Sequence, residues 1–261
     1  FEEKLMDKLN ARVGAKKIVF IHDVIPLMFQ NWVVPFSRYI DLYNRADLLI
    51  APSQAMVDFL RSNGLTVKKV VIQRMWDCVL SVDSARRPQF KKVLNFAGNP
   101  NKDAKLAFVR EWKYDNVQLA VTVDNGDWAQ DKNIRFLGWF NNDNLLAEAL
   151  RNSGGFGLLW SENPYWREYM KKNASYKFST YLAAGIPVIV PSGIAEEETV
   201  IRKNLGLVVD SLDEAVERIE QMSEDEYNKM VESVESVAYL LREGYFTKKA
   251  LTDAVFKLLY E

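Results

Sequence analysis

Short apolar segments alternate with amphipathic ones along most of the chain. The apolar segments are rich in β-branched residues and predict strands at 17–21, 48–51, 69–72, 93–97, 117–123, 133–137, 156–159, 187–190 and 206–210. Their apolar positions are continuous rather than alternating, which is typical of parallel strands buried on both faces. Because helical spacing fills the segments between them, we expect an α/β fold with helices covering parallel sheets.

Several helix ends carry local signals. Ser211 and Ser223 each stand three residues before a glutamate, a spacing that predicts a capping box. Thr247 is expected to open the last helix. The pattern also predicts a helix over 176–184 that ends at Gly185, followed by a buried strand.

The series of strands is interrupted between 72 and 93, where residues 81–89 lack apolar periodicity and resemble a linker. We therefore predict a partial Rossmann-like domain at 1–86, a complete one at 87–244, and a helix at 245–261 that crosses back toward the first domain. The first domain is expected to be incomplete, because three strands are few for such a domain. The chain also opens inside a helical pattern, so we expect the natural protein to have a further N-terminal segment.

Composition argues against several classes of function. The 34 basic side chains balance 35 acidic ones, so nucleic acid is a poor candidate partner. One cysteine, Cys78, and one histidine cannot build a zinc or iron–sulfur site, so we expect no metal. The longest apolar run, at 182–190, is far shorter than the roughly 20 residues that span a bilayer. We expect a cytoplasmic protein without a membrane span.

In open parallel sheets, ligands bind beyond the carboxyl ends of the strands. His22 and Asp23 follow the first predicted strand, where they could act as a general base or orient an acceptor hydroxyl. The alternative is that His22 satisfies local backbone groups. Gly98 and Asn99 follow the fourth strand, where a glycine would let a ligand approach the backbone, although a simple turn explains them as well.

Two further segments follow strand ends. The main chain of Gly138 and Trp139 could hydrogen-bond the edge of a planar base, and the Trp139 ring could cover its face. The alternative is that Trp139 is a core or interface residue, which is the commoner role of such a tryptophan. The aromatic stretch at 160–172 is either a lid over a cleft or a protein-binding surface. The helix at 176–184 should point its N-terminus toward the cleft between the domains, where free amides favour a diphosphate. Lys177 lies in the first turn of this helix, where it could bind an anion together with the free amides. The alternative is that Lys177 is an exposed lysine with no ligand.

These motifs resemble the glucosyltransferase-three-like group of GT-B glycosyltransferases, which glycosylate serine-rich repeat adhesins, and its bacterial galactofuranosyltransferase relatives. The resemblance covers nearly the whole chain. It rests on the segments 20–27, 43–47 and 51–53 and on Tyr176-Lys177 before 184–188. It implies two Rossmann-like domains with parallel sheets, of which the second binds a UDP-sugar and the first binds the acceptor.

The resemblance also implies roles for the candidate residues. It places the donor contacts on Gly98, Asn99, Gly138, Trp139, Asn173, Tyr176, Lys177, Phe178 and Ser179, and places His22 and Asp23 on the acceptor side. It implies transfer of a hexose, glucose, to N-acetylglucosamine on a serine-rich repeat glycoprotein, with no cofactor and no metal. A homo-oligomer such as a tetramer is expected.

Two other functions remain open. A non-catalytic GT-B-like protein could bind glycoprotein and assist a true transferase. A UDP-sugar epimerase could share the architecture, although few acid or base candidates follow the strands. No Asp-x-Asp pair occurs in the sequence, which argues against a metal-dependent GT-A transferase.

Overall fold

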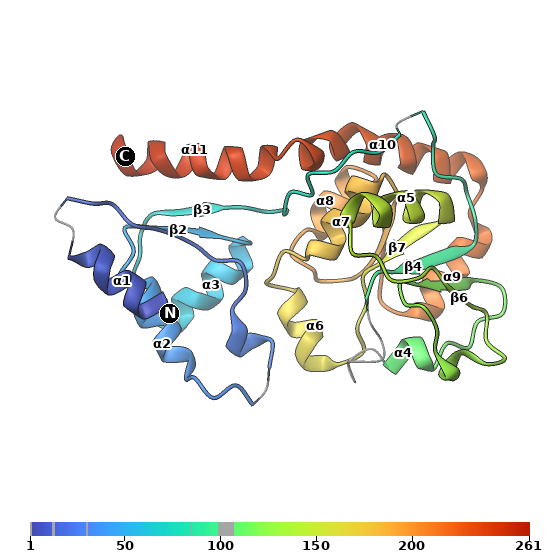
Figure 1. The fold of residues 1–261 in the computed structure, drawn as a ribbon, viewed down its shortest axis with the longest axis horizontal. Coiled ribbons are helices and arrows are strands. Elements are labelled where there is room, and N and C mark those ends of the chain that lie inside the picture. The colour runs from blue at the N-terminus through green and yellow to red at the C-terminus, as the bar shows by residue number, and fades with distance from the viewer. Residues whose placement is uncertain (1, 12–13, 30, 84, 99–106) are drawn as a thin grey trace.

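The computed structural model describes residues 2–11, 14–29, 31–83, 85–98 and 107–261. Its strands form two parallel sheets (Figure 1). The first sheet contains β1 (Ile18–Phe20), β2 (Leu48–Ala51) and β3 (Val70–Ile72) in that order. The second has the order β6-β5-β4-β7-β8-β9, with β4 (Val93–Phe96), β5 (Gln118–Val121), β6 (Ile134–Phe136), β7 (Phe156–Leu158), β8 (Val188–Pro191) and β9 (Gly206–Val209). Every strand expected from the apolar runs is present.

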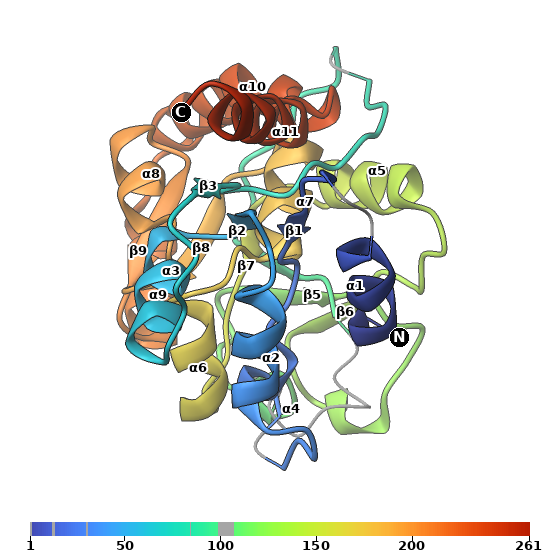
Figure 2. The ribbon, with the colours of Figure 1, turned by 90° about the vertical axis from the view of Figure 1, so that its left-hand side faces the viewer.

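Helices connect these strands and cover the sheets (Figure 2). They are α1 (Glu2–Asn10), α2 (Phe36–Tyr43), α3 (Gln54–Ser62), α4 (Ala107–Arg110), α5 (Asp143–Ser153), α6 (Pro164–Met170), α7 (Tyr176–Ala184), α8 (Glu197–Arg202), α9 (Leu212–Gln221), α10 (Glu224–Arg242) and α11 (Tyr245–Leu259), with short 3-10 turns at Ile25–Leu27 and Asp127–Ala129. None of the helices in the described ranges is long and apolar enough to cross a membrane.

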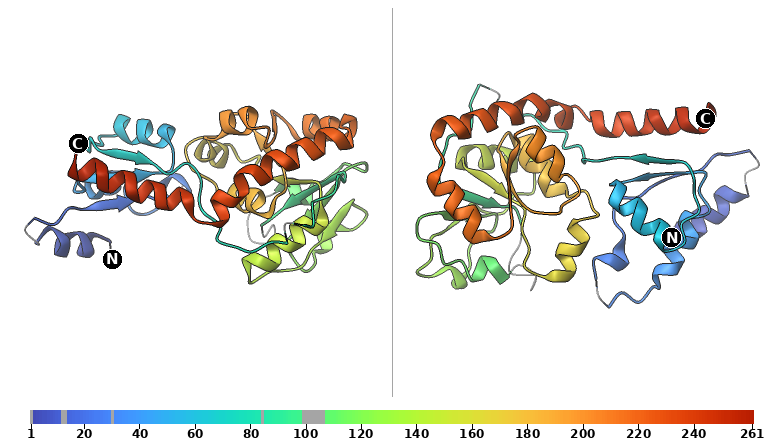
Figure 3. Two further views of the ribbon diagram at one scale, coloured as in Figure 1. Left: turned by 90° about the horizontal axis from the view of Figure 1, so that it is seen from above. Right: turned by 180° about the vertical axis from the view of Figure 1, so that it is seen from behind.

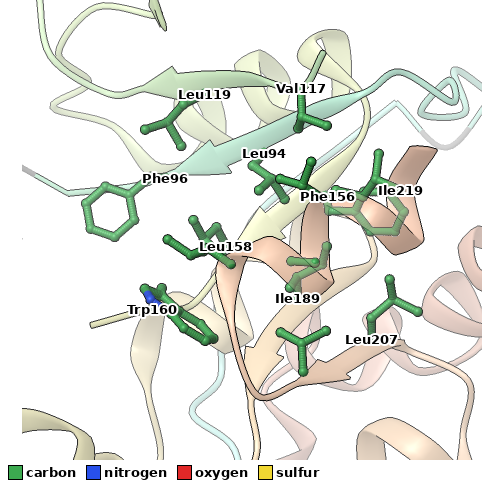
Figure 4. Packing of buried hydrophobic residues seen from close by; sticks show 14 of the residues in the cluster. Leu94, Phe96, Val117, Leu119, Phe156, Leu158, Trp160, Ile189, Leu207 and Ile219 are labelled. Atoms are coloured by element: carbon green, nitrogen blue, oxygen red, sulfur yellow. The ribbon is translucent and has the colours of Figure 1, made fainter. Parts of the chain in front are cut away.

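The second sheet is buried on both faces. Alternate residues of β8 enter different clusters: Ile189 joins the cluster of Figure 4, whereas Val188 and Val190 join the one that contains α7. Because neighbouring residues of a strand point to opposite faces, these clusters lie on opposite sides of the sheet. This two-sided burial explains why the strands have continuous apolar runs.

Helix capping follows the sequence in part. Ser223 and Glu226 form the predicted capping box at α10. At α9 the box is only half present: Ser211 caps Glu214, but the Glu214 carboxylate accepts from the amide of Asp210 instead. The predicted start of α11 at Thr247 is wrong by two residues.

The start of α11 depends on a distant carboxylate. Asp77 accepts from the amides of Phe246 and Thr247 at 3.1 and 2.7 Å, so the helix begins without a local cap. From there α11 runs end to end with α10 and lies along the first sheet (Figure 3). Its small residues Ala250 and Ala254 pack in one cluster with Leu48, Ile50 and Val71. The proposed division of the chain near residue 86 stays a prediction.

Candidate functional site

The helix α7 is fixed at the carboxyl end of the second sheet. The buried hydroxyl of Tyr181 accepts from the amide of Ala97 at 2.8 Å and donates to the carbonyl of Leu158 at 3.1 Å. These bonds join α7 to the ends of β4 and β7, where the strand order reverses. Gly185 ends the helix as predicted, in the left-handed conformation with φ 84°.

The first turn of α7 lies beside the end of β4. Ser175, which precedes the helix, makes no side-chain cap. The Nζ of Lys177 is 4.8 Å from the centre of the Phe96 ring. A Cβ added to Gly98 would lie 3.2 Å from that Nζ and 2.7 Å from the Phe96 ring. The structure therefore brings together Gly98 and Lys177, two residues predicted to contact the donor.

The neighbouring loops are fixed at the same edge. The amide of Gly98 donates to Thr122, just beyond β5, at 3.0 Å. The amide of Trp139 donates to Asp124 at 3.0 Å, which holds the Gly138-Trp139 loop after β6 against the end of β5. The Trp139 side chain is 62% exposed, so it is not a core residue. Asn99 lies outside the described residues.

Two residues of α7, Phe178 and Ser179, direct their side chains into the protein interior. Phe178 is buried in the core cluster that contains α7, and the buried hydroxyl of Ser179 accepts from the amide of Trp76 at 3.2 Å. A donor contact at these positions would therefore use the main chain. The hydroxyl of Tyr176 donates to Asp143 at 3.3 Å, at the first residue of α5.

His22 and Asp23 form a hydrogen-bonded pair beyond β1. The Nδ1 of His22 lies 2.9 Å from the Oδ2 of Asp23. The other oxygen of Asp23 accepts from the Tyr169 hydroxyl at 2.7 Å and from the Asn173 amide at 3.3 Å. A carboxylate on the first sheet is therefore bound by two side chains that follow β7, and the predicted residues His22, Asp23 and Asn173 belong to one network.

Trp76 joins this pair to α7. Its ring lies 4.3 Å from the His22 ring, and its indole nitrogen donates to the carbonyl of Ala174 at 2.8 Å. Its main-chain amide donates to Ser179. One tryptophan thus contacts both His22 and the segment that leads into α7.

Sequence reasoning missed Trp76 and Tyr169 as members of the site. Tyr169 belongs to the aromatic stretch at 160–172, and the aromatic composition of that stretch was the one sequence feature that pointed to it. The side chain is 3% exposed, and burial together with the neighbouring Asp23 raises the pKa of its hydroxyl. Tyr169 therefore stays protonated and donates to the carboxylate across the physiological range.

A small cavity of about 20 Å³ lies between the two sheets, beside the segment that precedes α7. Arg74 lines it from the end of β3, and Glu196 lines it from the loop after β8. Glu196 is 8% exposed, and burial raises the pKa of its carboxyl group. Among the described residues no group of three or more metal-ligating side chains was found.

Comparison with known proteins gives consistent matches. The family model for the glucosyltransferase 3-like N-terminal domain matches residues 1–75, and that for the C-terminal domain matches 94–254. Glucosyltransferase 3 of Streptococcus parasanguinis is 40% identical over 263 residues, which are 99% of this chain and 76% of that protein.

Two solved structures share the fold at low sequence identity. Sucrose-phosphate synthase of Thermosynechococcus elongatus has a TM-score of 0.67 at 14% identity, over 95% of this chain and 70% of that one. Anabaena HepE, solved with UDP and glucose, has a TM-score of 0.65 at 14% identity, over 98% and 76% of the two chains. The architecture is that of the GT-B glycosyltransferases, which confirms the expected fold class.

Proposed function

Because the chain belongs to the glucosyltransferase 3-like family, we propose that it transfers glucose from a UDP-sugar to a sugar on a glycoprotein. The chain is a glycosyltransferase of the glucosyl type. N-acetylglucosamine on a serine-rich repeat glycoprotein is the acceptor that we propose, on the strength of the sequence resemblance. The expected homo-oligomer, cytoplasmic location and absence of a metal requirement stay predictions.

The arrangement of Lys177 and Gly98 at the first turn of α7 carries the donor proposal. A helix N-terminus presents unsatisfied amides and a partial positive charge, both of which favour a diphosphate. The Lys177 ammonium adds a full positive charge at the same edge, and Gly98 lets the ligand come close to the backbone. HepE, with the same fold, was solved with UDP and glucose bound.

This arrangement also suits the chemistry of glycosyl transfer. The bond between the sugar C1 and the UDP oxygen breaks, a bond between C1 and the acceptor oxygen forms, and the acceptor hydroxyl loses its proton. Negative charge develops on the departing UDP, where Lys177 and the α7 amides would stabilise it. His22, hydrogen-bonded to Asp23, would orient the acceptor hydroxyl or take its proton.

Replacing His22 with alanine tests this assignment. General acid–base catalysis typically contributes about 10²–10⁴-fold, so kcat should fall by that order. The Kd for UDP, measured by calorimetry, should stay unchanged because His22 lies beyond β1 rather than at Gly98. Wild-type kcat in the variant would assign His22 a structural role. A wild-type protein that binds no UDP would instead favour the non-catalytic glycoprotein-binding alternative.

A further inference from the structure

We propose that Tyr169 is a positioning residue: together with Asn173 it holds the Asp23 carboxylate so that His22 is fixed with its Nε2 free to accept a proton. This inference rests on the proposed function, and it adds to it the two residues that orient the histidine. Both come from the segment between β7 and β8, whereas His22 and Asp23 follow β1.

The two oxygens of Asp23 have different tasks. Oδ2 faces the Nδ1 of His22 at 2.9 Å, and Oδ1 accepts from Tyr169 at 2.7 Å and from Asn173 at 3.3 Å. Two donors on one oxygen fix the rotation of the carboxylate about its Cβ–Cγ bond. The other oxygen is then directed at the imidazole ring.

This geometry determines which ring nitrogen carries the proton. An ionised carboxylate only accepts hydrogen bonds, so the Nδ1 that faces it must be the protonated nitrogen. In the neutral ring Nε2 is then the acceptor. Within the described part of the chain, Nε2 has no hydrogen-bond partner, and the His22 side chain is 62% exposed. The acceptor nitrogen is therefore available to a substrate hydroxyl.

The surroundings keep the imidazole in place from a second direction. The ring of Trp76 lies 4.3 Å from it at an angle of 31°. The indole nitrogen of Trp76 is itself bound to the carbonyl of Ala174, one residue after Asn173. The plane of the imidazole and its hydrogen bond are thus both set by groups attached to the segment before α7.

Tyr169 is suited to this task by its own contacts. The side chain is 3% exposed and packs in the core cluster of the first sheet, although α6 follows β7 of the second sheet. Its oxygen also lies 3.4 Å from the amide of Val24, so the hydroxyl can accept there while it donates to Asp23. Hydrogen bonds in such a chain strengthen one another.

One consequence is that the histidine is oriented only while the two sheets are in contact. The pair that would act on the acceptor belongs to the first sheet, and its orienting donors belong to the second. Separating them would leave Asp23 free to rotate and the neutral imidazole free to populate both tautomers.

Nuclear magnetic resonance can test the inference directly, because His22 is the only histidine in the chain. The ¹⁵N shifts of a neutral imidazole distinguish a protonated nitrogen from an accepting one. In the full chain, at a pH well above the ordinary histidine range, Nδ1 should give the protonated type of shift and Nε2 the accepting type. In Tyr169→Phe the two shifts should move toward each other, as for a mixture of tautomers.

Tyr165→Phe is the matched control. Tyr165 lies on the same helix. Its hydroxyl also bonds to the segment that follows β1, because it donates to the carbonyl of Pro26 at 2.6 Å. It does not contact Asp23, so its loss should leave the His22 shifts unchanged. If Tyr169→Phe fails to fold, Asn173→Ala serves instead, because it removes the longer bond to the same oxygen and should move the shifts in the same direction, by less.

Kinetics give the second readout. In Tyr169→Phe, kcat should fall about 10- to 100-fold, the range known for groups that orient metal-ligating histidines, with the Kd for UDP unchanged. Unaltered ¹⁵N shifts in the variants that remove a donor to Asp23 would overturn the inference. A shift change in Tyr169→Phe, with His22→Ala fully active, would support the positioning role and refute the proposed function of His22 instead.

Discussion

Replacing Lys177 with methionine tests whether the first turn of α7 binds the diphosphate. The variant loses the ammonium group but keeps an apolar side chain over the Phe96 ring, which lies 4.8 Å from Nζ in the wild type. A hydrogen bond to a charged group is worth about 1.5–3 kcal/mol, and each 1.4 kcal/mol changes affinity tenfold. The Kd for UDP should therefore rise by about 10- to 150-fold, with little change in melting temperature.

Lys172→Met is the matched control for this prediction. Lys172 also lies over an aromatic ring, 5.3 Å from the centre of Phe59, but it precedes α7 and pairs with Glu168. Titration calorimetry with UDP at low and high salt should show the loss for Lys177→Met only, and the difference should shrink as salt rises. Equal affinities for the wild type and Lys177→Met, or an equal loss in both variants, would refute the diphosphate assignment.

Three further changes have defined outcomes. Tyr181→Phe should lower the free energy of unfolding by about 1–3 kcal/mol for each of the two backbone groups it leaves unpaired, as measured by urea denaturation. Gly98→Ala should weaken UDP binding roughly tenfold or more in calorimetry, because the new Cβ would lie 2.7 Å from the Phe96 ring and displace it. Burial raises the pKa of Glu196 above its ordinary value of 4.5, so the folded state holds this proton more tightly than the unfolded state. The stabilisation that this group contributes is therefore complete below pH 4.5 and is lost as pH rises through the pKa of the folded state. Glu196→Gln should flatten this fall in stability, as measured by denaturation midpoints between about pH 4 and about pH 8.

The elements that the sequence predicts well are those with local causes. The strands have continuous apolar runs because both faces of each sheet are covered, and this pattern needs no knowledge of distant residues. The end of α7 at Gly185 was predictable because a left-handed residue after a helix favours glycine. The placement of Gly98 and Lys177 at one edge followed from the direction of parallel strands.

Features that depend on distant partners were not predictable. Tyr169 and Asp23 are 146 residues apart, and their bond exists only because α6 packs against the first sheet. Thr247 has the local character of a helix cap, but Asp77, 170 residues earlier, supplies the acceptor and lets α11 begin at Tyr245. Phe178 and Ser179 follow Lys177 in sequence, yet the rotation of α7 turns their side chains into the core.

The packing of α11 on the first sheet has a consequence for biosynthesis. Ala250 and Ala254 complete a cluster with Leu48 and Ile50, and the Lys69 ammonium donates to the carbonyl of Lys257, 188 residues later. The ribosome synthesises the strands of the first sheet long before it synthesises α11. The apolar face of the first sheet therefore stays uncovered while the second sheet is made. Since such distant contacts form slowly and leave apolar surface exposed, the nascent chain is expected to be prone to aggregation during that interval.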